Sequence, residues 1–181
     1  MTFQEIYDTR PDKQEVGSSG YSNLKHLYDY CIKLKPDIII ESGTWKGNSS
    51  YLFHKACPNA VIICHDINFS NLMWKNNRIN YREKDIEEYL YQPPTIKQVL
   101  LFFDDHINQE QRLKWLIKNK FKHVIFDDNT PTSNLHEYKA PPVPTLEILR
   151  EQGKLPPLKQ YKVLPFLGKS KRNTFLTYIE I

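Results

Sequence analysis

Short runs of apolar, often β-branched residues alternate along this chain with longer segments in which apolar residues recur every three or four positions. The short runs predict buried strands, and the longer spacing predicts amphipathic helices. The expected strands cover residues 37–41, 60–66, 80–82, 98–105 and 122–128. The expected helices cover residues 21–35, 48–55, 108–120 and 145–154. This alternation is typical of a parallel sheet whose strands are joined by crossover helices.

The two ends of the chain have different patterns. Residues 161–167 and 174–181 are strand-like runs close in sequence, which predicts an antiparallel hairpin. Residues 1–20 have no periodic pattern and are expected to be irregular. The chain, residues 1–181, is therefore expected to be a single α/β domain with a Rossmann-like, mostly parallel central sheet, helices on both faces and a C-terminal antiparallel hairpin. In such sheets ligands bind beyond the carboxyl ends of the strands.

The composition is that of an ordinary globular protein, with 40% hydrophobic and 25% charged residues. The net charge of +4 comes without a clustered basic stripe, so no nucleic acid partner is expected. No segment approaches the roughly 18–20 apolar residues that span a bilayer, and residues 1–14 lack the apolar run of a signal peptide. Cys31, Cys57 and Cys64 lack metal-site spacing and are expected to be free thiols, which favours a reducing compartment. We expect a soluble, cytoplasmic protein with no membrane partner.

A loop with two glycines, in the sequence IIIESGTWKGNSS, follows the first expected strand. It places Glu41 at the strand tip and Gly43 and Gly47 four positions apart, directly before an expected helix. Glycines let the backbone turn sharply and approach a ligand closely, and a helix N-terminus offers free amides. The loop has neither the phosphate-loop pattern GxxxxGK[ST] nor the dinucleotide pattern GxGxxG. On its spacing alone it is equally an ordinary strand-to-helix turn.

Asp66 ends the second expected strand, 25 positions after Glu41. An acidic side chain at this place can accept hydrogen bonds from both hydroxyls of a ribose. Taken alone, Asp66 is as readily a turn residue or a helix cap. Together with the loop at Gly43 and Gly47, it favours a nucleoside-binding site.

The segment ESGTWKG resembles the first motif of the class I S-adenosylmethionine-dependent methyltransferases, an acidic residue followed by GxxxG. The resemblance implies that Gly43, Thr44 and Gly47 lie against the methionine part of S-adenosylmethionine and that Asp66 binds its ribose. It also implies an acid near the adenine amino group, for which Asp85 is the candidate, although this residue is equally placed to cap a helix. The candidate cofactor residues are thus Glu41, Gly43, Thr44, Gly47, Ser49, Asp66 and Asp85.

Two further expected strands each run into a pair of aspartates, in the segments LLFFDDH and HVIFDDN. Neighbouring strands would bring these four carboxylates together, which raises their pKa values and costs stability unless a cation is present. Carboxylate and amide oxygens suit Mg²⁺ or Mn²⁺. The alternative is that one aspartate of each pair points inward and the other caps a helix.

The acidic pairs also resemble those of the metal-dependent O-methyltransferases, of the catechol type and of the type that modifies sugars. The catechol-type pattern implies Asp105, Asp128 and Asn129 as metal ligands. The sugar-type pattern implies Asp104, Asp127 and Asp128. Asp128 belongs to both patterns.

His106 follows the first acidic pair and is the candidate general base, because imidazole titrates near neutral pH. The catechol-type enzymes have a lysine three residues past the metal aspartate, where this chain has Asn108. This difference favours His106 over a catechol-like mechanism, with Asp105 as the second catalytic candidate. The alternative for His106 is a structural hydrogen bond to the aspartates.

The sequence therefore predicts an S-adenosylmethionine-dependent O-methyltransferase that uses Mg²⁺ or Mn²⁺ and acts on a hydroxyl of a sugar or another small polyol. Residues 136–144 are expected to form a substrate lid. Two alternatives keep the fold: a metal-dependent glycosyl- or nucleotide-sugar-processing enzyme, and a non-catalytic nucleoside-binding module. A homo-oligomer is left open.

Overall fold

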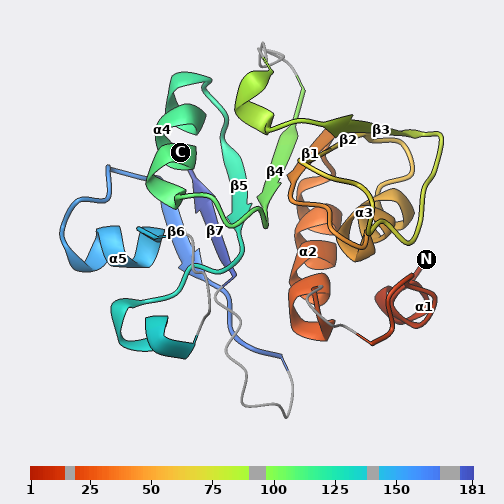
Figure 1. The fold of residues 1–181 in the computed structure, drawn as a ribbon, viewed down its shortest axis with the longest axis horizontal. Coiled ribbons are helices and arrows are strands. Elements are labelled where there is room, and N and C mark those ends of the chain that lie inside the picture. Colours follow the sequence, from red (N-terminus) through yellow and green to blue (C-terminus); the bar gives the residue numbers. More distant parts are fainter. Residues whose placement is uncertain (15–18, 90–96, 138–142, 168–175) are drawn as a thin grey trace.

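A seven-stranded sheet forms the centre of the molecule (Figure 1). The structure is a computed structural model, and it describes residues 1–14, 19–89, 97–137, 143–167 and 176–181. The strands, in the spatial order β3-β2-β1-β4-β5-β7-β6, are β1 (Ile38–Ser42), β2 (Val61–Asp66), β3 (Ile79–Glu83), β4 (Val99–Phe103), β5 (His123–Phe126), β6 (Gln160–Val163) and β7 (Thr177–Glu180). Part of the expected lid, residues 138–142, lies outside the described residues.

The first five strands are parallel to one another, and β7 is antiparallel to both β5 and β6. This arrangement confirms the expected parallel sheet and its C-terminal antiparallel hairpin. In a parallel sheet the carboxyl ends of the strands share one edge. The residues that follow β1 to β5, where the sequence places its candidate site, therefore meet at that edge.

Helices cover both faces of the sheet. Their bounds are α1 (Phe3–Asp8), α2 (Tyr21–Leu34), α3 (Asn48–Ala56), α4 (Gln109–Lys118) and α5 (Leu146–Glu151), with short 3-10 helices at Ile86–Glu88 and Thr132–Glu137. Alternate residues of a strand face opposite sides. Leu100 and Phe102 of β4 accordingly pack into the core with α2 and α3, whereas Leu101 and Phe103 pack with α4 and α5. Figure 1 shows these two groups of helices on opposite sides of the sheet.

The N-terminal segment corrects one prediction, because residues 1–20 are not irregular throughout. Residues 3–8 form α1, whose first turn carries a capping box between Thr2 and Glu5. The helix buries Phe3 and Ile6. Six residues are too few to show a helical period, and so the Thr-x-x-Glu pattern was the available signal.

Gly43 allows the tips of β1 and β4 to approach one another. Its φ is +87°, and a Cβ atom there would lie 2.1 Å from the backbone oxygen of Asp104. The backbone amide of Asp104 donates to the carbonyl of Ser42, which fixes the two tips in contact. No other residue type fits this position without moving the β4 tip.

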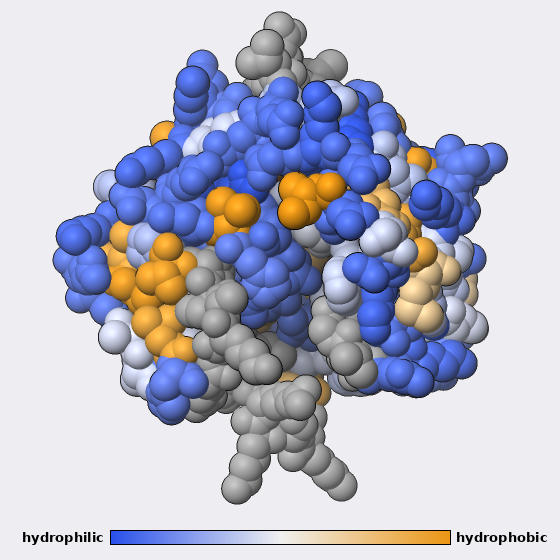
Figure 2. Space-filling model, viewed as in Figure 1, coloured by the Kyte–Doolittle hydropathy of each residue, from blue (hydrophilic) through white to orange (hydrophobic). Residues whose placement is uncertain are grey.

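Hydrophilic side chains cover most of the face shown in Figure 2, and apolar side chains gather there only in small groups. In the part of the chain that the structure describes, no helix combines the length and apolar character needed to cross a membrane.

Candidate active site

A cavity of about 530 Å³ opens at the carboxyl edge of the sheet. It lies where the first four strands end, and its wall includes Ser42, Gly43, Trp45, His65, Asp66, Ile67, Asn68, Lys84, Asp85, Asp104, Asp105 and His106. Ligand sites in proteins are commonly cavities of roughly 300–1,000 Å³. The position and size are therefore those of a small-molecule site.

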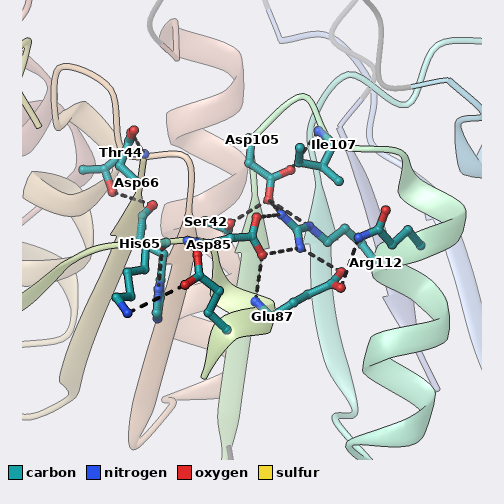
Figure 3. Close-up of polar contacts among 12 residues, drawn as sticks. Ser42, Thr44, His65, Asp66, Asp85, Glu87, Asp105, Ile107 and Arg112 are labelled. Atoms are coloured by element: carbon teal, nitrogen blue, oxygen red, sulfur yellow. Dashed lines mark hydrogen bonds and ion pairs between the residues drawn. The ribbon is translucent and has the colours of Figure 1, made fainter. Parts of the chain in front are cut away.

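Asp66 anchors the glycine loop to the tip of β2. Its Oδ2 accepts hydrogen bonds from the backbone amides of Thr44 and Trp45, both at 2.9 Å, and its Oδ1 accepts one from Asn68 at 3.0 Å. Figure 3 shows this carboxylate against the loop. Each carboxylate oxygen has two acceptor sites. The Oδ1 atom therefore keeps capacity for a further donor in the cavity.

Three of the seven predicted cofactor residues line the cavity, namely Gly43, Asp66 and Asp85. The side chains of Glu41, Thr44 and Ser49 are buried beneath the loop. Gly47 has a φ of +90° and turns the chain into α3. The structure thus assigns these four residues to the shape of the loop, and does not place their side chains on the cavity wall.

Glu41 is the most deeply buried of these residues, with no exposed surface. Thr44 Oγ1 donates to its Oε2 at 3.1 Å, and its Oε1 has no hydrogen-bond partner among the described residues. Burial raises the pKa of Glu41 to about 7, against the hydrogen bonds that lower it. The Glu41 carboxyl thus lies under the loop and keeps its proton to a higher pH than an exposed glutamate does.

The two acidic tips meet beside this cavity. Carboxylate oxygens of Asp104 and Asp128 and a ring nitrogen of His106 all lie within 4.8 Å of one another. A second cavity of about 10 Å³ lies between the tips, and its wall includes these three residues and Asp127. A space of roughly 10–15 Å³ holds one water molecule. This cluster is therefore of the size and donor type that suit a single hard cation.

His106 and Asp128 are paired across the two tips. The His106 Nδ1 and Asp128 Oδ2 atoms are 3.1 Å apart, and the histidine side chain is 62% exposed. The hydrogen bond to Asp128 raises the pKa of His106. Both residues have left-handed backbones, with φ of 55° and 54°. Such strain in non-glycine residues is common at functional sites.

Asp127 is held from the opposite direction by α2. Asn23 Nδ2 donates to its Oδ2 at 2.6 Å, and the Asp128 amide donates to its Oδ1 at 2.8 Å. Burial, and then the charge of Asp128, raise the pKa of Asp127 to about 7. Burial and the charges of Asp127 and Asp128 also raise the pKa of Asp104 well above its usual range. The crowding of carboxylates that the sequence implied is therefore present.

Asp105 does not belong to this cluster, which corrects its prediction as a metal ligand. Its carboxylate accepts from Ser42 Oγ at 2.6 Å and from Arg112 Nε at 3.0 Å (Figure 3). Burial raises the pKa of Asp105, although Arg112 opposes this rise. The carboxylate is thus engaged with Ser42 and Arg112, and it is not among the ligand atoms of the cluster, although the residue lies in the wall of the cation-sized space.

Asn129 also departs from its predicted role as a metal ligand. The side chain is 1% exposed, and its amide donates to the hydroxyls of Tyr161 and Thr177 and accepts from the Glu147 backbone amide. Its polar atoms are therefore occupied in joining β5 to the hairpin and α5. Of the two predicted ligand patterns, the structure brings together Asp104 and Asp128 of the sugar-type pattern.

Asp85 lies in the wall of the cavity and caps the 3-10 helix at Ile86–Glu88. Burial disfavours its charge, but hydrogen bonds from Arg112 and from the Glu87 amide outweigh burial and lower the pKa of Asp85. Sequence reasoning missed Arg112 and Asn23. Both lie inside expected helices, and no sequence pattern marks either side chain as turned towards the site.

No protein-family model matches the sequence, and a search of curated proteins found no similar sequence. Solved methyltransferases do have the same fold. A putative O-methyltransferase from Klebsiella pneumoniae superimposes with a TM-score of 0.69 and 16% identity, over 99% of this chain and 89% of that chain. The O-methyltransferase from Bacillus cereus in complex with S-adenosylhomocysteine gives 0.65 and 17%, over 99% and 90%.

A structure of CmcI with magnesium and S-adenosylmethionine gives a TM-score of 0.65 and 16% identity, over 98% of this chain and 84% of that chain. The sequence identity is low in all three comparisons, so they establish the fold and not the chemistry. The chain has the Rossmann-like fold of the class I methyltransferases, as the ESGTWKG motif implied.

The raised pKa of Asp127 predicts how stability depends on pH without divalent cations. The folded protein holds a proton up to about pH 7 on Asp127 and on Glu41, whereas the unfolded chain releases these protons near pH 4. The folded state thus binds more protons between these values, and the free energy of unfolding falls as the pH rises from 4 to 7. Asp127→Asn should flatten this fall.

Urea unfolding at pH 5, 6, 7 and 8, in the presence of a chelator, measures the effect. Asp29→Asn, which changes an exposed carboxylate on α2, is the matched control and should keep the wild-type slope. Equal slopes in wild type and Asp127→Asn would show that Asp127 is ionised in the folded protein throughout this range.

Proposed function

We propose that the protein is an S-adenosylmethionine-dependent O-methyltransferase that uses a divalent cation to bind its acceptor. One observation carries the proposal. The large cavity and the cation-sized space share Asp104, Asp105 and His106 in their walls. A methyl donor in the first space and an acceptor oxygen bound at the second would therefore meet at the β4 tip. Methyl transfer needs such an in-line approach of the two reactants.

The shape and lining of the large cavity support S-adenosylmethionine as its ligand. Asp66 offers a free acceptor site for a ribose hydroxyl. Asp85, also in the cavity wall, offers a carboxylate for the adenine amino group. Ile67, also in the wall, is 80% exposed and provides an apolar surface for a flat base. The Bacillus cereus relative in fold is in complex with S-adenosylhomocysteine, the product of this cofactor.

The donors at the acidic tips fit Mg²⁺ or Mn²⁺. Asp104 and Asp128 would hold the cation, with Asp127 beside them, because hard cations prefer carboxylate oxygens and the neighbouring carboxylates repel one another. When bound, the cation would hold the acceptor and would stabilise a deprotonated hydroxyl. A sugar or another small polyol, with adjacent hydroxyls, is the acceptor that suits such a site.

His106 is the residue that we assign as general base. With Nδ1–H donating to Asp128, the neutral ring has its lone pair on Nε2, on a side chain that is mostly exposed to the site. The carboxylate orients the ring and stabilises its protonated form, as in other carboxylate–histidine pairs. Asp105, engaged by Arg112, is not assigned a proton-transfer role.

The cofactor assignment predicts that S-adenosylhomocysteine binds and that Asp66→Ala weakens this binding. The substitution removes a charge-assisted hydrogen bond to a ribose hydroxyl, which is worth on the order of 1–3 kcal/mol, and it also releases the loop. Isothermal titration calorimetry measures the change. Glu83→Ala, which removes an exposed acid at the neighbouring β3 end, is the control and should bind normally. Wild-type protein that gives no heat at millimolar ligand would exclude the cofactor.

The cation assignment predicts that Mn²⁺ raises the melting temperature of the wild type with the logarithm of its concentration above the dissociation constant. Asp128→Ala should abolish this rise, because it removes a carboxylate of the cluster that also pairs with His106. Asp105→Asn should retain it, since that side chain faces Arg112. The opposite result, with Asp105 needed and Asp128 dispensable, would reverse the assignment.

The base assignment predicts an acidic limb in the pH–rate profile for any polyol acceptor that is methylated. Activity falls at low pH because protonated His106 cannot accept the hydroxyl proton. His106→Ala should lower turnover by roughly 10²–10⁴-fold, the usual contribution of general-base catalysis, while S-adenosylhomocysteine affinity stays nearly unchanged. Near-normal turnover in this variant would remove His106 from the role.

A further inference from the structure

Arg112 of α4 is a charged side chain that is almost completely buried, with 1% of its surface exposed. Three carboxylates surround its guanidinium, those of Asp85, Glu87 and Asp105 (Figure 3). A buried charge is stable only when it is paired and hydrogen-bonded. Asp85 and Glu87 lie on the segment after β3 and Asp105 lies after β4, so the arginine of α4 joins separate parts of the chain.

The contacts engage all three nitrogens of the side chain. Nη1 and Nη2 bind the two oxygens of Asp85 at 2.9 and 2.5 Å, Nη1 also binds Glu87 at 2.8 Å, and Nε and Nη2 bind Asp105 Oδ2 at 3.0 and 2.8 Å. A guanidinium has five N–H donors in a fixed plane, whereas a lysine ammonium has three on a flexible stem. Lysine could keep the charge here but could not reproduce the fork.

Two of the three partners line the large cavity, and they come from different strand ends. Asp85 follows β3 and Asp105 follows β4, which are separated in the sheet by β2 and β1. Glu87 is not part of the cavity wall as defined by the described residues. Arg112 therefore joins the segment after β3 to the segment after β4, and it holds Asp85 and Asp105 close together in the cavity wall.

Among the described residues, Arg112 forms no ion pair with the aspartates of the candidate metal-binding cluster. Its ion pairs are with Asp85, Glu87 and Asp105, and not with Asp104 or Asp128, although Asp105 also lies in the wall of the cation-sized space. The charges at the carboxyl edge thus fall into two groups: those neutralised by the arginine, and those at the acidic tips. A change at Arg112 should act on the first group and leave the second.

We propose that Arg112 is a positioning residue that fixes Asp85 and Asp105 next to each other in the cavity wall and thereby sets the shape that binds the cofactor. This inference rests on the proposed cofactor. It gives Asp105 a role in the cavity wall, and it fixes the orientation of the Asp85 carboxylate. The arginine itself would not touch the ligand.

A double-mutant cycle on the full chain tests the inference, with Arg112→Lys, Asp85→Asn and the double variant. Calorimetry gives the affinity for S-adenosylhomocysteine, and Mn²⁺ binding is measured on the same samples at a temperature where each is folded. We expect about a tenfold or greater loss of S-adenosylhomocysteine affinity in each single variant, and no further loss in the double variant, because both changes break one unit. Mn²⁺ affinity should stay at the wild-type value. Arg150→Lys, which alters an exposed arginine paired with the buried Glu147 of α5, is the control and should change neither.

Three results would overturn the proposal. Wild-type affinity for S-adenosylhomocysteine in Arg112→Lys or in Asp85→Asn would show that the fixed carboxylate contributes nothing to the cavity. Additive losses, or a parallel loss of Mn²⁺ binding, would show that Arg112 only supports the fold. If Arg112→Lys does not fold, the Asp85→Asn variant alone decides the test. A selective loss of S-adenosylhomocysteine binding in Asp85→Asn supports the proposal, and unchanged binding in that variant overturns it. A wild type that binds no S-adenosylhomocysteine would instead defeat the proposed function itself.

Discussion

Repulsion between carboxylates at the carboxyl edge of the sheet is the constraint that organises this molecule. The parallel topology brings acidic residues after β1 to β5 to one edge, where burial and like charge both oppose ionisation. The chain meets this constraint in different ways at different positions. Asp66 accepts hydrogen bonds from backbone amides, Asp105 is paired with Arg112, and burial raises the pKa of Glu41 to about 7. The cluster of Asp104, Asp127 and Asp128 has only His106 as a cationic partner among the described residues, and this shortage is the physical basis for the proposed cation.

Backbone geometry at the strand tips keeps these groups at fixed distances. The close approach at Gly43 brings the β1 and β4 tips into contact, and the left-handed backbones of His106 and Asp128 turn their side chains towards each other. The left-handed backbones of His106 and Asp128 are unfavourable in isolation. The sheet register, the buried strands and the capping hydrogen bonds hold them in place. The rigid sheet thus keeps the strained residues at the strand tips in position. Preorganisation of this kind is what a site for in-line group transfer needs.

Most of the sheet could be predicted from the sequence, because a buried strand has a short apolar run and a hairpin has two such runs close together. The first helix could not be predicted from its period, since six residues complete less than two turns. At the site, the sequence predicted which segments meet, but it did not predict which aspartate of each adjacent pair has which partner. The pairs Asp104–Asp105 and Asp127–Asp128 have equal composition, and their roles depend on partners that are remote in sequence. Arg112 donates a hydrogen bond to Asp105, and Asn23 donates one to Asp127. Asn129 looked equivalent to a metal ligand by position, but three partners from the hairpin and α5 hold its amide.

A crystal structure with S-adenosylhomocysteine and Mn²⁺, with anomalous scattering measured at the manganese edge, tests the central claim most directly. The account predicts the ligand in the cavity with its ribose at Asp66, and one anomalous peak between the carboxylates of Asp104 and Asp128. A peak coordinated by Asp105 and Asn129, or S-adenosylhomocysteine bound away from this edge of the sheet, would contradict the account.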